Sequence, residues 1–277
     1  MDTAAPTSTY RAHWGLRETP FPSGLAPRLF FQSPCHEEAL ARLEFLVEQR
    51  QRLGLLLGLS GTGKSLVLDR LATNLRRDGA QVANLSLLGI DLHEFLWLLA
   101  AELGLNPDRR KSHFELWRDL IDRVDENRYQ QLDTVILLDD ADGGQPEVLD
   151  HLVRLIQSDR GMPTSLVLVL AAPAEKVSRI GARLLELAEL RIDLDPWEES
   201  DTAGYLISAL SLAGRKTLLF TDAAVLRLHE LTGGIPRRVN QLASLALVAG
   251  AGRQLTTIDA DTIDSVYREL GVIETAA

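Results

Sequence analysis

The period of apolar and polar positions changes repeatedly along the chain and predicts alternating strands and helices up to about residue 196. Apolar runs typical of strands buried on both faces occur at residues 53–57, 134–139 and 165–170. Shorter strands are expected at 80–87 and 190–194. Helical spacing predicts intervening helices at residues 37–52, 66–72, 92–103, 114–124 and 146–158. This alternation predicts an α/β fold with a mostly parallel sheet flanked by helices.

Strand signals stop after Pro196, and helical periodicity continues at residues 200–213, 222–231, 236–249 and 259–270. The first residues are rich in Ala, Thr and Pro, and a Pro-, Gly- and aromatic-rich segment follows them. The sequence therefore predicts four parts. They are a disordered tail over residues 1–9, an amino-terminal arm and helix over 10–52, an α/β core over 53–196 and a small helical lid domain over 197–277.

One glycine-rich segment of the expected core fits G-x-x-x-x-G-K-[ST], the phosphate-binding loop (P-loop, or Walker A motif) of nucleoside triphosphatases. The glycines permit backbone conformations that turn N–H groups inward, at the start of a helix. Lys64 can reach the β- and γ-phosphates, and the Ser65 hydroxyl can bind Mg²⁺. The alternative is a chance glycine-rich turn, but the flanking strand and helix favour a site for ATP and Mg²⁺. Its predicted binding residues are Gly58, Ser60, Gly61, Thr62, Gly63, Lys64 and Ser65.

A second acidic motif, Asp139-Asp140, ends the apolar run at residues 134–139. Behind a P-loop, Asp139 is the expected metal-side carboxylate (Walker B), beside Ser65. Asp140 is placed to orient or polarise the attacking water. The alternative is a strand that runs into an acidic turn. With the P-loop, the pair predicts ATP hydrolysis to ADP and phosphate.

Composition limits the class of protein. The net charge of −10 disfavours coating of nucleic acid, although a local basic patch remains an alternative. The single Cys35 excludes an internal disulfide framework and favours a reducing compartment. The chain shows no secretory-signal pattern and no apolar run of about 18–20 residues, the length of a membrane span. We therefore expect a cytoplasmic protein without a membrane span.

Four segments of the chain resemble the AAA+ ATPases, and within them the group around the general secretion pathway A protein and pilus-biogenesis ATPases. The first segment combines Trp14 to Phe21, Pro27 to Phe31 and Ser33 to Leu40, which are similar to that group's amino-terminal motif. The second and third are the P-loop and Asp139-Asp140. The fourth, Thr232 to Asn240, is similar to the group's G-G-x-P-R-x-[IV]-N signature.

The resemblance implies further site residues. It implies that Arg237, in the last motif, approaches the γ-phosphate from the helical lid; the alternative is a surface arginine on a capped helix. It also implies that Arg191 reaches the nucleotide of a neighbouring subunit as an arginine finger, with Arg179 and Arg183 as alternatives. A homo-oligomer or nucleotide-dependent self-association follows from that role.

Two positions depart from the family pattern. Ala171-Ala172 stand where a polar sensor is expected, and Asp140 stands where most relatives have Glu. Three hypotheses follow. The first is an ATPase, of normal or slow turnover, that drives conformational change in a secretion- or pilus-like protein assembly. The second is a nucleotide-gated binding module with little turnover, and the third is a DNA-associated AAA+ adaptor of the transposition or initiation type.

Overall fold

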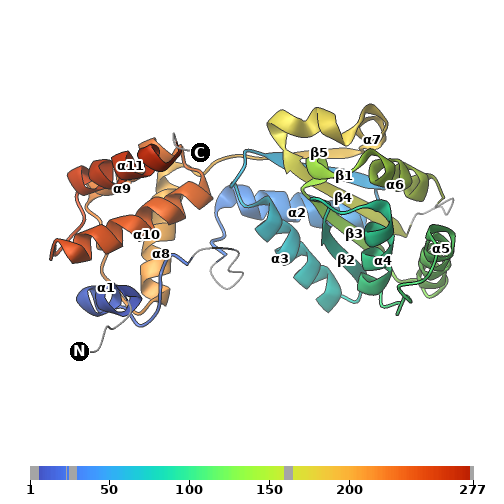
Figure 1. The fold of residues 1–277 in the computed structure, drawn as a ribbon, viewed down its shortest axis with the longest axis horizontal. Coiled ribbons are helices and arrows are strands. Elements are labelled where there is room, and N and C mark those ends of the chain that lie inside the picture. The colour runs from blue at the N-terminus through green and yellow to red at the C-terminus, as the bar shows by residue number, and fades with distance from the viewer. Residues whose placement is uncertain (1–5, 23, 25–29, 159–164, 275–277) are drawn as a thin grey trace. The chain divides into compact units, whose positions relative to one another are not determined.

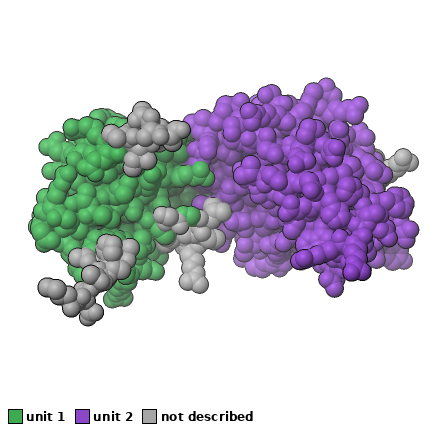
Figure 2. All heavy atoms as spheres, viewed as in Figure 1, with its two compact units in different colours: residues 1–33, 196–277 green, residues 34–195 purple. Residues whose placement is uncertain are grey.

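A computed structural model describes residues 6–22, 24, 30–158 and 165–274 of the chain. It consists of two compact units, one of residues 1–33 and 196–277 and the other of residues 34–195 (Figure 2). The second unit contains the sheet, and the first is helical. The two are therefore referred to as the α/β unit and the helical unit.

The sheet of the α/β unit has five strands in the order β2-β3-β4-β1-β5, and every neighbouring pair is parallel (Figure 1). β1, β3 and β4 are buried along nearly their whole length, as expected for a parallel sheet covered on both faces. The strands are β1 (Leu53–Gly58), β2 (Gln81–Ser86), β3 (Thr134–Asp139), β4 (Leu166–Pro173) and β5 (Leu190–Leu194).

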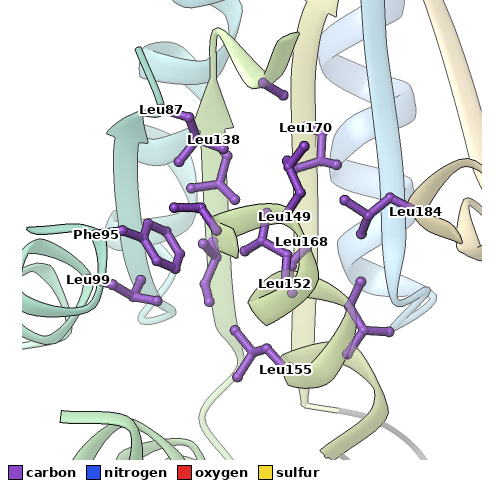
Figure 3. Packing of buried hydrophobic residues seen from close by; sticks show 14 of the residues in the cluster. Leu87, Phe95, Leu99, Leu138, Leu149, Leu152, Leu155, Leu168, Leu170 and Leu184 are labelled. Atoms are coloured by element: carbon purple, nitrogen blue, oxygen red, sulfur yellow. The ribbon is translucent and has the colours of Figure 1, made fainter. Parts of the chain in front are cut away.

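Alternate residues of the strands pack against helices on opposite faces of the sheet. One face contributes Leu138, Leu168 and Leu170 to a core completed by Phe95, Leu152 and other helix residues (Figure 3). On the other face, Leu46 of α2 (Pro34–Glu48) lies against Gly54 of β1. A Cβ placed on Gly54 would lie 2.4 Å from Leu46 Cδ1, so α2 packs directly onto β1. The helices and 3₁₀ segments are α2 (Pro34–Glu48), α3 (Lys64–Arg77), α4 (Leu92–Glu102), α5 (His113–Tyr129), η2 (Ala141–Gly143), α6 (Pro146–Ser158), η3 (Ala174–Ile180) and α7 (Ala182–Leu187).

The helical unit contains α1 (Pro6–Trp14), α8 (Glu199–Leu212), α9 (Asp222–Thr232), α10 (Pro236–Gly252) and α11 (Ala260–Glu274). Trp14 is 2% exposed, and its indole N–H donates a 2.7 Å hydrogen bond to the carbonyl of Leu247 in α10. α1 is therefore anchored to α10 through one buried aromatic side chain. Within the described ranges, no helix combines the length and the apolar character that a membrane crossing requires.

The amino-terminal region differs from the prediction. α1 begins at Pro6, so the expected tail over residues 1–9 overlaps a helix; residues 1–5 lie outside the described ranges. The helix was missed because it has nine residues and depends on packing of Trp14, which local periodicity does not report. The expected single arm-and-helix part is also divided, because its first segment belongs to the helical unit and α2 to the α/β unit.

The glycine pair between α9 and α10 has a packing role. Gly233 (φ +60°) caps α9 in the left-handed conformation, and Gly234 (φ +66°) follows it. The Trp197 N–H donates to the Gly234 carbonyl at 2.9 Å. A Cβ on Gly234 would lie 2.1 Å from the Trp197 carbonyl oxygen, whereas one on Gly233 would meet nothing within 4 Å. Pro236 then occupies the first turn of α10, where its missing N–H is harmless.

We expect Gly234→Ala to destabilise the helical unit much more than Gly233→Ala. Both substitutions place a side chain at positive φ, which costs roughly 1–2 kcal/mol. Only Gly234→Ala also forces a clash with the Trp197 backbone, which adds about 2 kcal/mol or more. Urea denaturation of the two variants measures the difference. Equal losses in the free energy of unfolding would contradict the close approach of Trp197.

Candidate nucleotide-binding site

The predicted P-loop connects β1 to α3 in the α/β unit. Gly58 ends β1 beside β5, where a Cβ would lie 2.5 Å from the Leu194 carbonyl oxygen and 2.9 Å from Thr62 Oγ1. Thr62 is fully buried, and its hydroxyl donates to the Leu59 carbonyl at 3.0 Å. Gly58 is therefore required by close packing and not, as the sequence analysis expected, by an unusual φ.

The other two glycines of the loop adopt the conformations that the motif predicts. Gly61 has φ +91° and Gly63 has φ +105°. Gly63 immediately precedes α3, and its carbonyl accepts from the Val67 N–H at 3.0 Å. The N–H groups in the first turn of a helix have no intrahelical acceptor, so this end of α3 favours an anion.

Lys64 lies inside the loop and is only 8% exposed. Its Nζ donates to the carbonyl oxygens of Gly58 at 3.0 Å and Leu59 at 2.9 Å. The ammonium is thus held within the loop's own backbone, close to the first turn of α3. A point charge in this position suits the phosphates of a nucleotide.

Ser65 and Asp139 meet, as the sequence predicted. The Ser65 hydroxyl is hydrogen-bonded to the Asp139 carboxylate, and Asp139 Oδ1 also accepts from the Asp140 N–H at 2.9 Å. Burial raises the pKa of Asp139, and the neighbouring Asp140 charge also raises it, against the lowering by these hydrogen bonds and by Lys64. Added positive charge is favourable beside such a carboxylate. The hydroxyl and carboxylate oxygens therefore fit Mg²⁺, which prefers oxygen ligands.

Asp140 is held in a defined orientation at the same edge of the sheet. Its backbone is left-handed (φ 50°, ψ 40°), and its Oδ2 accepts the Ser86 hydroxyl at 2.8 Å. Ser86 is the last residue of β2 and pairs in register with Asp139. None of the described residues donates to Asp140 Oδ1, so that oxygen can accept a proton or a hydrogen bond from another molecule.

β4 ends between the two halves of the site without a polar side chain. It lies between β1 and β3, and Ala172 pairs in register with Leu57 just before the P-loop. Ala171 and Ala172 are at most 1% exposed, and Ala172 belongs to the apolar core. The departure noted in the sequence thus places buried methyl groups where the resemblance leads one to expect a hydrogen-bonding sensor.

All the predicted arginines are exposed. Arg191 is exposed on β5, and its Nε and Nη2 donate to Asp193 at 2.8–3.1 Å, which raises the pKa of Arg191. Arg179 in η3 and Arg183 in α7 are also exposed. Arg237 belongs to the helical unit, is exposed in the first turn of α10 and forms no hydrogen bond or ion pair with the described residues.

Three contacts at the site were not anticipated. Ser86 orients Asp140, and the buried His36 lies 2.9 Å from the Thr62 carbonyl oxygen. Lys176 forms a 3.4 Å ion pair with the nearly buried Asp142, in the turn after Asp140. A signal existed for Ser86, because polar residues at the ends of neighbouring parallel strands meet at one edge. His36 and Lys176 had no comparable signal. Their contacts join a helix to a loop and one 3₁₀ segment to another, and these elements are not neighbouring strands of the sheet.

The strand, loop and helix, with Lys64 and the Ser65–Asp139 pair, define a P-loop nucleotide-binding site. A family model described as "AAA domain" matches residues 47–177. The chain also resembles general secretion pathway protein A of Aeromonas hydrophila, with 32% identity over 251 residues. That similarity covers 88% of this chain and 45% of the relative, so the chain spans less than half of that protein's length.

Solved structures share the fold. CDC6P from Pyrobaculum aerophilum has a TM-score of 0.73 at 18% identity and covers 90% of this chain and 70% of its own. The Aeropyrum pernix ORC2 protein has a TM-score of 0.68 at 15% identity, covering 91% and 71%. The RuvB branch migration motor of Thermotoga maritima has a TM-score of 0.59 at 15% identity, covering 91% and 74%. The predicted fold class is confirmed: a P-loop core with a parallel sheet, followed by helices.

We expect Asp139→Asn to stabilise the nucleotide-free protein at neutral pH. Because burial raises the folded-state pKa of Asp139 above its ordinary 3.8, the ionised carboxylate destabilises the fold at pH above that raised value. The penalty diminishes as pH falls through the raised pKa and disappears below 3.8, where Asp139 is protonated in both states. Removing the charge should therefore increase the free energy of unfolding at neutral pH and not at low pH.

Urea denaturation across this pH range measures the effect. Asp150→Asn, at an exposed position of α6, is the matched control for loss of one negative charge. If Asp139→Asn does not stabilise the protein, or stabilises it no more than the control does, then burial does not destabilise the ionised Asp139 carboxylate.

Proposed function

We propose that the chain is an AAA+ ATPase that binds ATP and Mg²⁺ and hydrolyses ATP to ADP and phosphate. The carrying observation is the pairing of Ser65 with Asp139 beside a P-loop that holds Lys64. These residues come from segments about seventy positions apart, yet they form the ligand set that nucleoside triphosphatases require. The AAA-domain match over residues 47–177 supports the same activity.

Each group at the site has a distinct proposed task. The N–H groups of residues 58–65 cradle the phosphates, and Lys64 supplies positive charge to the β- and γ-phosphates. Ser65 and Asp139 hold Mg²⁺, which when bound neutralises charge on the phosphate oxygens. Asp140, fixed by Ser86, orients the attacking water and accepts hydrogen bonds through Oδ1. In the helical unit, the resemblance supports Arg237 as the residue that senses the γ-phosphate.

We propose that the energy is used to change conformation in a protein assembly. The similarity to general secretion pathway protein A supports a secretion- or pilus-related partner. Homo-oligomerisation or nucleotide-dependent self-association would complete each site with an arginine from a neighbour. The absence of cysteine pairs is compatible with a cytoplasmic location, which we include in the proposal.

A nucleotide-gated binding module with little turnover is the second candidate. It is favoured by Ala171 and Ala172, whose buried methyl groups offer no hydrogen bond to a γ-phosphate or an attacking water. A DNA-associated adaptor is the third. An Aeropyrum pernix ORC1 protein solved in complex with DNA shares the fold at 20% identity, but that likeness concerns the fold alone, and the net charge of −10 disfavours DNA.

Lys64→Ala is expected to weaken ATP binding at least about a hundredfold, because it removes a buried charge aimed at the phosphates. Isothermal titration calorimetry measures the ATP affinity, and steady-state assays measure ATP hydrolysis as a function of protein concentration. The Lys64→Ala variant is the blank in both experiments. Turnover per subunit that rises with concentration supports an ATPase completed by self-association. Tight binding without turnover above the blank supports the gated module. Wild-type ATP affinity in Lys64→Ala would refute the P-loop assignment.

Arg191→Ala is expected to leave ATP affinity unchanged and to reduce turnover about a thousandfold or more in the assembled protein, as for other arginine fingers. Arg191 would leave its ion pair with Asp193 and contact the γ-phosphate of the nucleotide bound to the neighbouring subunit. Arg118→Ala, at an exposed position of α5, is the control for loss of an exposed arginine. If turnover at saturating protein concentration is equal in Arg191→Ala and the wild type, Arg191 serves only the ion pair on β5.

A further inference from the structure

His36 is the third residue of α2 and only 2% exposed. Its Nε2 lies 2.9 Å from the carbonyl oxygen of Thr62 in the P-loop. A carbonyl oxygen can only accept, so Nε2 carries a hydrogen and donates it. His36 Nδ1 lies 3.5 Å from the Sγ of Cys35. The imidazole thus links the start of α2 to the backbone of the phosphate loop.

The same ring lies against the next residue of the loop. A Cβ built on Gly63 would be 2.6 Å from His36 Nε2 and 3.4 Å from Cδ2. The glycine therefore has two reasons to be present, its φ of +105° and the contact with the imidazole. His36 fixes both ends of the peptide between Thr62 and Gly63, one by a hydrogen bond and the other by packing.

The orientation of this peptide matters for phosphate binding. A trans peptide is planar, with its C=O and N–H pointing in opposite directions. Holding the Thr62 carbonyl toward His36 therefore aims the Gly63 N–H away from His36. That N–H belongs to the set that a P-loop turns toward the α- and β-phosphates. A buried imidazole costs free energy unless it is hydrogen-bonded, so an apolar residue would be the simpler choice for packing alone.

We propose that His36 is a positioning residue of the nucleotide site, which orients the Thr62–Gly63 peptide so that its N–H meets the phosphates. The inference rests on the proposed nucleotide binding. It adds that α2, outside the motif, determines how well the loop is organised before nucleotide arrives. Pre-organisation of this kind raises affinity because less ordering remains to be done on binding.

Two substitutions separate the hydrogen bond from the packing. His36→Phe keeps a ring and removes the donor, whereas His36→Gln places a side-chain N–H at a similar reach. His36→Leu is the second donor-free variant, in case the larger phenyl ring prevents folding. His113→Phe, at the exposed first residue of α5, controls for the loss of a histidine elsewhere.

Titration with fluorescent ATP and ADP analogues measures the effect. His36→Phe or His36→Leu is expected to weaken both nucleotides about three- to tenfold, the value of one hydrogen bond. ATP and ADP should be affected equally, because both carry the phosphates that the loop cradles. His36→Gln should remain within about twofold of the wild type. Unchanged affinity in the donor-free variants, or a loss in His36→Gln as large as theirs, would overturn the proposal.

Amide hydrogen exchange of residues 61–64 without nucleotide provides the readout that is independent of the proposed function. Exchange should be about three- to tenfold faster in the donor-free variants and restored in His36→Gln. If the wild type binds neither nucleotide but exchange changes in this way, the proposed function fails and the positioning of the loop stands. If exchange is the same in all variants, the positioning role fails regardless of nucleotide affinity.

Discussion

The partly buried carboxylate of Asp139 is the constraint on which the nucleotide site depends. A carboxylate at the end of an apolar strand is disfavoured by desolvation, which raises its pKa. The parallel sheet compensates by bringing the end of β3 close to the loop after β1, from which Ser65 and Lys64 act on the carboxylate. The compensation is incomplete, so a cation is favoured at this edge. The Mg²⁺ of the proposed site would relieve this unfavourable charge.

Glycine shows how motif residues satisfy packing as well as chemistry. Gly58 leaves room for the Leu194 carbonyl, and Gly63 for the His36 ring. Gly234 leaves room for the Trp197 carbonyl, although its motif suggests a role near the γ-phosphate. In each case the backbone of one element approaches a distant segment closely. A glycine motif can therefore be retained because the fold needs it, even where its catalytic role is lost. The presence of the motif alone does not establish ATP turnover.

Local pattern predicted most of the fold. β3, β5 and α6 have the bounds that periodicity gives, because each buries a regular face. α1, η3 and α7 were missed, since they are short and gain their stability from tertiary contacts. At the site, the P-loop and Asp139 could be predicted because their roles follow from residue type and spacing. Ser86 and His36 act through contacts with residues 54 and 26 positions away. The strand pattern gave a signal for Ser86, at the end of a strand beside β3, but none for His36.

The geometry provides for phosphate binding more fully than for hydrolysis. In the proposed site, Lys64, the first turn of α3 and the peptide held by His36 would all act on the phosphates, and Asp139 with Ser65 would hold the metal. In the proposal, hydrolysis relies on Asp140 within a subunit and on Arg191 from its neighbour, because β4 ends in buried alanines. Interactions that bind substrate and transition state equally lower KM without raising kcat. Under the proposed function, such a site would bind ATP more effectively than it hydrolyses ATP, and the residues supplied by a neighbouring subunit would set the rate of turnover.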